Sequence, residues 1–232
     1  MSAGLLRHLL DGLLVTLQLT IFGGALGLVF AVVAGLARLS RSRPVRALAF
    51  VYTEGFRGLP ALVVLFWFVF ALPRLGFQML PLFAGVLALA LNIGAYGAEV
   101  VRGAIRAVPN SQLEAATALN FTRWQRMRLV VFPQALVAMV PPFGNLLIEL
   151  LKATALVSIV YIPDLTFQGQ LVRAATGNTA MTFFGLLLGY AVIALAFTGF
   201  MRWVERRAAT SVGRQPEPGL VTRMIRRREV AA

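Results

Sequence analysis

Five long apolar stretches constrain this sequence more than any other feature, because each is long enough to cross a membrane as an α-helix. A membrane-spanning helix needs about 20 mainly apolar residues. We predict five spans, over residues 12–37, 47–72, 80–101, 135–161 and 182–203. The chain is 59% apolar and 13% charged, whereas soluble domains are about half apolar and about a quarter charged. The expected fold is therefore an all-α membrane protein with five transmembrane helices.

Clusters of arginine predict the orientation of these spans, because positive residues gather on the cytoplasmic side of a membrane. The segments after the first, third and fifth spans are rich in arginine, whereas the segment before the first span is nearly neutral. We therefore expect residues 1–11 outside the cell, a cytoplasmic loop over 102–134, and a basic cytoplasmic tail over 205–232. This topology, with lipid headgroups near the tail, explains the net charge of +13 without nucleic acid.

Particular residues predict local features of the spans. Pro60 lacks a backbone N–H and predicts a kink or break near Leu59 in the second span. Glu99 and Arg102 lie one helical turn apart near the inner end of the third span, which favours a structural ion pair. The segment 161–182, between the fourth and fifth spans, is expected to be an outer loop.

The cytoplasmic loop contains a first helix-start signal at Ser111. Glu114 follows three residues later, and this spacing is typical of a capping box, in which each side chain bonds the other residue's backbone N–H. We predict that a helix begins at Ser111 and ends at Leu119. Asn120 follows, and asparagine tolerates the left-handed conformation that ends helices.

A second helix-start signal follows directly. Thr122 and Gln125 have the spacing of another capping box and predict a second helix through Trp124, Met127 and Leu129, which share one face. The loop is therefore expected to form a helix, an elbow and a second helix. Its apolar residues beside arginines suit docking into a groove of another protein. Similar residues would also suit an amphipathic helix resting on the lipid surface.

This two-helix segment resembles the EAA loop of binding-protein-dependent ABC importer permeases, most closely the polar amino acid family that includes histidine and glutamine permeases. Asn120 stands where the family has glycine, and Phe132 stands where it has leucine before Pro-Gln. Four further segments look like family segments in the same order: Tyr52–Pro60, Tyr96–Gly103, Pro142–Asn145 and Lys152–Ser158.

The resemblance implies one transmembrane subunit of an importer in the bacterial cytoplasmic (inner) membrane, carrying a polar amino acid or similar small zwitterion by alternating access. It implies three kinds of protein partner: a second permease subunit that is identical or paralogous, two ABC ATPase subunits, and an extracytoplasmic solute-binding protein. Membrane lipid would surround the complex. ATP and Mg would be bound by the ATPases. The residues implied in ATPase coupling are Ser111, Glu114, Ala115, Ala116, Asn120, Phe121, Trp124 and Pro133.

We predict that the chain itself is not an enzyme and holds no cofactor or metal. It has no glycine-rich loop ending in Gly-Lys-Ser or Gly-Lys-Thr, and its only lysine, Lys152, lies in an apolar span. His8 is its only histidine and cysteine is absent, so a nucleophilic triad or a metal cluster is not indicated. The energy for uphill transport would come from the ATPase partners.

The fourth span carries an unusual pair of charges, Glu149 and Lys152, on one helical face. Charges at that depth face a bundle interior or a wet cavity. The pair could neutralise itself and fix subunit packing, or it could line the solute path, with Glu149 attracting an ammonium group and Lys152 a carboxylate. Thr154 and Ser158 are expected on about the same face. Related permeases usually have Asp and Ser where Ala153 and Ala155 stand here.

Two rival functions remain open at this point. The chain could be an ATP-independent secondary transporter or channel subunit, with Glu149 and Lys152 as coupling or selectivity groups. It could also be a membrane subunit that only scaffolds others. Transport by the chain alone under an ion gradient would favour the first rival, and transport that tolerates Glu114→Lys would favour the second.

Overall fold

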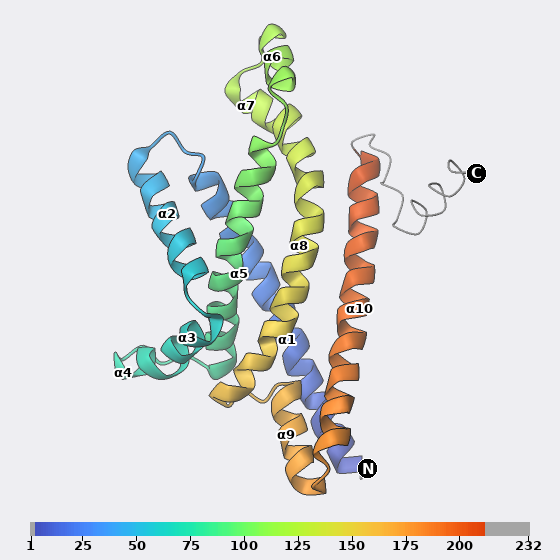
Figure 1. The fold of residues 1–232 in the computed structure, drawn as a ribbon. Helices are drawn as coiled ribbons and strands as arrows, with labels where there is room; N and C mark the ends of the chain where they lie inside the picture. Colours follow the sequence, from blue (N-terminus) through green and yellow to red (C-terminus); the bar gives the residue numbers. More distant parts are fainter. Residues whose placement is uncertain (1–2, 212–232) are drawn as a thin grey trace, which may run out of the picture.

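The computed structural model describes residues 3–211, which form a bundle of α-helices without a strand in that range (Figure 1). Four helical stretches in it are long and apolar enough to cross a membrane: Leu6–Ala37, Pro81–Arg106, Arg123–Val160 and Thr179–Ala208. A bent helix pair, Arg43–Gly58 with Ala61–Arg74, makes a fifth if the two parts count as one span. The predicted all-α membrane fold is confirmed.

Helix α1 (Ala3–Ala37) packs along α5 (Pro81–Arg106), and glycines bring the two backbones close together. A Cβ on Gly27 would lie 2.5 Å from the Ile93 side chain, and one on Gly97 would lie 2.6 Å from Ala31. Helix α1 begins well before residue 12, so most of the predicted external N-terminus, 1–11, is helical. Larger residues at these two glycines would push the helices apart.

The predicted break near Leu59 is confirmed, and it is sharper than a kink. Helix α2 (Arg43–Gly58) ends there because Leu59 and Pro60 are both extended, with ψ of 135° and 134°. The chain then turns by 105° into α3 (Ala61–Phe66), the π-helix η1 (Trp67–Ala71) and α4 (Leu72–Arg74). We call Ala61–Arg74 the arm. It lies across the direction of α2 (Figure 1), so the predicted span 47–72 is divided into two differently directed helical parts.

Much of the segment 102–134, the predicted cytoplasmic loop, is helical. Helix α5 continues to Arg106, and helix resumes at α7 (Arg123–Gln125), which passes through the π-helix η2 (Arg126–Val131) into α8 (Phe132–Thr154). Between them lies α6 (Asn110–Ala118). Helices α6 and α7 project beyond the other helices at one end of the bundle (Figure 1).

The predicted outer loop 161–182 contains a helix instead. The 3-10 helix η3 (Ala155–Val160) ends at Tyr161, and α9 (Leu165–Thr176) follows before α10 (Thr179–Ser211). Asp164 begins α9 by accepting a hydrogen bond from the Phe167 N–H at 2.9 Å, and Gly177 ends it in the left-handed conformation. Helix α10 extends past residue 205, so the predicted tail 205–232 begins as helix; its residues 212–232 lie outside the described range.

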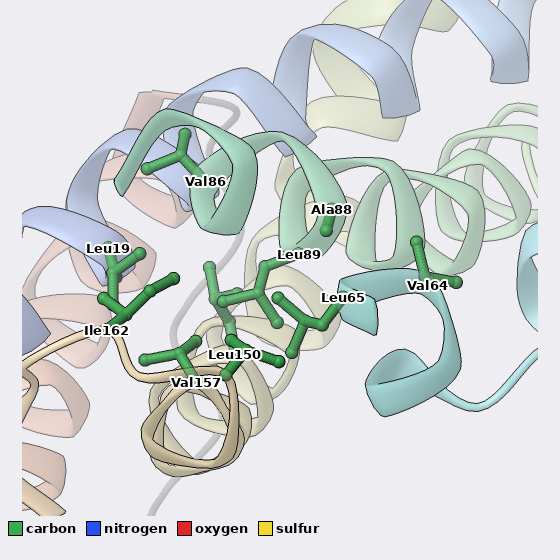
Figure 2. Packing of buried hydrophobic residues seen from close by; sticks show 10 residues of the cluster. Leu19, Val64, Leu65, Val86, Ala88, Leu89, Leu150, Val157 and Ile162 are labelled. Atoms are coloured by element: carbon green, nitrogen blue, oxygen red, sulfur yellow. The ribbon is translucent and has the colours of Figure 1, made fainter. Parts of the chain in front are cut away.

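The main core lies where α1, α3, α5 and α8 meet. Its buried side chains include Leu19, Leu65, Leu89, Leu150 and Val157. Figure 2 shows Leu65 of the arm pointing toward Leu89, Leu150 and Val157. The arm is therefore anchored on the end of α8 and on η3 by apolar contact.

Candidate functional site

The first helix of the projecting segment begins one residue earlier than the sequence predicts. Pro109 is extended and stands at the N-cap of α6, so the helix starts at Asn110, and no side chain caps it. Ser111 is thereby placed inside the first turn, where its hydroxyl is past the capping position. The predicted capping box of Ser111 and Glu114 is wrong, because the preceding proline sets where the helix can start.

The turn between the two helices is built as predicted. Asn120 has φ of 57°, in the left-handed region. The Phe121 N–H donates to the Ala116 carbonyl at 3.0 Å, and the Asn120 N–H donates to the Thr117 carbonyl at 2.9 Å. This pair of bonds is a Schellman motif, which satisfies the last carbonyls of α6. We call residues 110–125 the elbow.

The second capping box is confirmed. The Gln125 N–H donates to the Thr122 hydroxyl at 3.3 Å, and the Thr122 N–H donates to the Gln125 side-chain oxygen at 2.8 Å. Arg126 also donates to the Thr117 hydroxyl at 2.8 Å, which ties the second helix back to the first. Helical structure then continues without interruption from Arg123 to Val160. The elbow is therefore joined to α8 by continuous helix.

The predicted coupling residues divide by exposure. Ala116 is buried inside the elbow, and Phe121 and Pro133 are half-buried. The exposed members are Ser111, Glu114, Ala115, Asn120 and Trp124. Leu119 and Trp124 expose 68% and 70% of their surface. The elbow thus presents a small apolar surface with one acidic residue, Glu114, in a rigid frame.

The predicted polar set of the fourth span does not share one face. Glu149 and Lys152 are exposed on α8, in line with the exposed Asn145, and we call these three residues the polar stripe. Thr154 is fully buried and its hydroxyl donates to the Leu151 carbonyl at 2.7 Å. Ser158 is also buried and donates to the Ala155 carbonyl at 2.8 Å. At about 100° per residue, Thr154 lies about 140° around α8 from Glu149, and Ser158 lies beyond α8 in the 3-10 helix η3.

An ion network joins α1, α2 and α5. The predicted pair is confirmed, since Arg102 Nε donates to the Glu99 carboxylate at 2.8 Å. Arg38 lies 3.2 Å from Glu99 and 3.7 Å from Glu54, and Arg57 lies 3.5 Å from Glu54. Sequence reasoning used Arg38 only as evidence of topology and missed this role. Its place directly after an apolar span was the only signal.

A buried carboxylate was also missed. Asp164 is fully buried at the start of α9, where Tyr190 of α10 donates a hydrogen bond to it at 3.0 Å. Thr16 of α1 accepts from the neighbouring Leu165 N–H at 3.0 Å. Burial raises the pKa of Asp164, against the opposing effect of its hydrogen bonds. The capping pattern at Asp164 could have revealed α9 in the sequence.

Comparison with known proteins places these features in context. The sequence model of a family described as binding-protein-dependent transport system inner membrane component matches residues 27–210. A probable amino-acid ABC transporter permease protein of Sinorhizobium fredii is 45% identical over 200 residues, covering 84% of each chain. The glutamine transport system permease protein GlnP of Escherichia coli is 35% identical over 202 residues, covering 86% of this chain and 92% of that one.

Solved structures agree in fold. The crystal structure of an amino acid ABC transporter with histidines matches with a TM-score of 0.81 at 34% identity, covering 87% of this chain and 94% of that chain. An inward-facing structure of the MetNI methionine ABC transporter matches with a TM-score of 0.76 at 23% identity. At that identity the match shows similarity of fold alone.

Proposed function

The chain belongs to the family of binding-protein-dependent transport system inner membrane components and is the permease component of an amino acid ABC transporter, and we propose that it moves its solute inward by alternating access. The family is one of multi-pass inner membrane transport proteins rather than enzymes. The proposal places the N-terminus outside and the C-terminus in the cytoplasm, as the arginine distribution favours. The solute would be a polar amino acid or similar small zwitterion.

The observation that carries the proposal is the elbow and its unbroken connection to α8. Leu119 and Trp124 are exposed at the projecting end, and helix runs from Arg123 to Val160. An exposed apolar surface on a rigid frame suits a groove in a partner. We propose that two ABC ATPase subunits, which bind ATP and Mg, supply that groove and the phosphoryl chemistry. Their closure would push the elbow and so move α8.

The polar stripe supports a second permease subunit, identical or paralogous, around a shared path. Glu149 and Lys152 are exposed in a membrane-spanning helix, and charged groups there face protein or water rather than lipid. We propose that this face of α8 lines the path, where Glu149 attracts the ammonium group and Lys152 the carboxylate. Thr154 and Ser158, which are buried, contribute to the path only if α8 rotates. An extracytoplasmic binding protein would deliver the solute.

Reconstitution tests the proposal. The permease is placed in proteoliposomes with its ATPase and binding-protein partners, and uptake of labelled glutamine, arginine and histidine is measured with and without internal ATP. We expect uptake of at least one polar amino acid only with ATP and all subunits. Uptake by the permease alone under an ion gradient would overturn the proposal in favour of a secondary transporter or channel.

A further inference from the structure

The break between α2 and α3 removes hydrogen-bond partners from backbone carbonyls. In a continuous helix, the Phe56 carbonyl would accept from the N–H of residue 60, but Pro60 has none. The Arg57 carbonyl would accept from Ala61, which lies beyond the 105° turn. The bent pair is apolar enough to lie in a membrane, where free carbonyls are costly because no water satisfies them.

Two side chains of α5 supply the missing donors. The Asn92 amide donates to the Phe56 carbonyl at 2.9 Å and to the Leu59 carbonyl at 3.4 Å. The Tyr96 hydroxyl donates to the Arg57 carbonyl at 3.2 Å. Asn92 and Tyr96 are four residues apart and so lie on one face of α5. Between them they bond three carbonyls at the break.

The neighbouring contacts fix the same end of α2 on α5. The Tyr52 hydroxyl donates to the Leu91 carbonyl at 2.9 Å, and the Arg57 guanidinium lies over the Tyr96 ring at 5.6 Å. Beyond the break, Leu65 of the arm packs with Leu150 and Val157 (Figure 2). The direction of the arm is therefore coupled to the part of α8 that carries the polar stripe.

We propose that Asn92 and Tyr96 are positioning residues that hold the break open and fix the direction of the arm. The Asn92 amide bridges the last turn of α2 and the extended Leu59, and the Tyr96 hydroxyl holds the carbonyl between them. Neither residue needs to touch the solute, because they act through the arm and its contact with α8. The consequence for transport rests on the proposed function; the consequence for the arm does not.

Distance measurements on the permease test the structural part. The chain has no cysteine, so spin labels can be placed without background at Leu48→Cys on α2 and at Leu75→Cys directly after the arm, both exposed. The variants are Asn92→Leu and Tyr96→Phe, which keeps the ring under Arg57. Tyr161→Phe is the matched control, because the Tyr161 side chain is exposed and far from the break in sequence.

In lipid nanodiscs we expect one narrow distance distribution for the parent and for Tyr161→Phe. Asn92→Leu should broaden or shift it, and Tyr96→Phe should do so to a smaller extent, since it removes one bond of three. If Asn92→Leu fails to fold, Tyr96→Phe alone decides. Unchanged distributions in every variant that folds would overturn the proposal, whatever the complete complex transports.

Uptake by the complete transporter tests the functional part. We expect Asn92→Leu to lower the maximal rate about fivefold or more while the apparent affinity for the loaded binding protein stays within about twofold. Asn92→Gln keeps an amide donor and should recover part of the rate. A displaced arm with a normal uptake rate would overturn the positioning role and leave the permease function standing. No uptake even by the parent chain would count against the proposed function instead.

Discussion

The Arg38 guanidinium, just past the end of α1, lies 3.2 Å from the Glu99 carboxylate on α5 and donates a 3.0 Å hydrogen bond to the Thr53 hydroxyl on α2. One side chain thus joins three helices. Arg38→Gln should lower the free energy of unfolding by about 1–3 kcal/mol, because it removes charge-assisted bonds to partly buried groups. Thermal unfolding in detergent measures this. Arg41→Gln, at an exposed neighbour, is the control, and an equal loss in both would contradict the assigned role.

Glu114→Lys should uncouple the elbow from the ATPases. Glu114 is exposed on α6, so its reversal leaves the permease fold intact and acts on the docking surface. We expect uptake by the complete transporter to fall about tenfold or more, which corresponds to about 1.4 kcal/mol of lost interaction. Gln112→Lys, exposed on the same helix, introduces the same residue as a control. Transport that tolerates Glu114→Lys would favour the scaffold interpretation.

Trp124→Ala should weaken binding of the ATPase subunits, because an exposed tryptophan in a rigid frame has the properties of an interface anchor. Loss of such an anchor costs about 2 kcal/mol, or about a 30-fold rise in Kd. Binding of purified ATPase to the permease in nanodiscs measures it. Trp203→Ala on α10, where the tryptophan exposes 51% of its surface, should have no effect on ATPase binding. An unchanged Kd for Trp124→Ala would favour the lipid-surface interpretation of the elbow.

Asp164 should give the permease a dependence of stability on pH. Because burial raises the pKa of Asp164, the folded protein binds this proton more tightly than the unfolded chain does. The stabilisation is complete below the unfolded pKa and is lost as pH rises through the folded pKa. The melting temperature of the parent chain should therefore fall as pH rises through the folded pKa of Asp164, and Asp164→Asn should remove this contribution to the fall.

Melting curves across the acidic range compare Asp164→Asn with Asp11→Asn, which changes an exposed carboxyl on α1. The Asp11 variant should keep the slope of the parent chain. Identical slopes for all three proteins would show that Asp164 titrates alike in the folded and unfolded states.

A charge swap on the polar stripe distinguishes its two roles. Glu149→Lys and Lys152→Glu should each abolish uptake, because each places two like charges on one face of α8. If the pair only fixes packing, the double swap should restore both subunit association and uptake. We expect the double swap to restore association but not uptake. A path that orients a zwitterion needs the negative charge at position 149 and the positive charge at position 152. Chromatography of the detergent-solubilised complex measures association separately.

Local chemistry made much of the elbow predictable. The Thr122 capping box and the left-handed Asn120 are set by residues a few positions apart, and both are found in the structure. Ser111 failed for an equally local reason, because Pro109 occupies the cap. Helix α9 was missed although Asp164 and Gly177 carry the signals of a helix start and end. A hydrophobicity pattern dominated by long spans obscures a short helix between two of them.

Contacts between distant segments lay beyond the sequence. Pro60 predicted a break but not its 105° turn, which depends on Asn92 and Tyr96 reaching carbonyls more than thirty positions away. The face shared by Glu149 and Lys152 followed from helical spacing, whereas the burial of Thr154 depends on where its neighbours lie. Periodicity gives the direction of a side chain around its own helix, and only the packed bundle determines what that direction faces.

Helix runs without interruption from Arg123 to Val160. The number of residues between the elbow and the polar stripe therefore sets the angle between them around the helix axis. Removing a single residue from the α-helical part of α8 after Pro133 would turn the elbow by about 100° around the helix axis relative to Glu149 and Lys152. A one-residue deletion there should therefore misalign docking surface and solute path even though both stay intact, and a compensating insertion elsewhere in α8 before Asn145 should realign them.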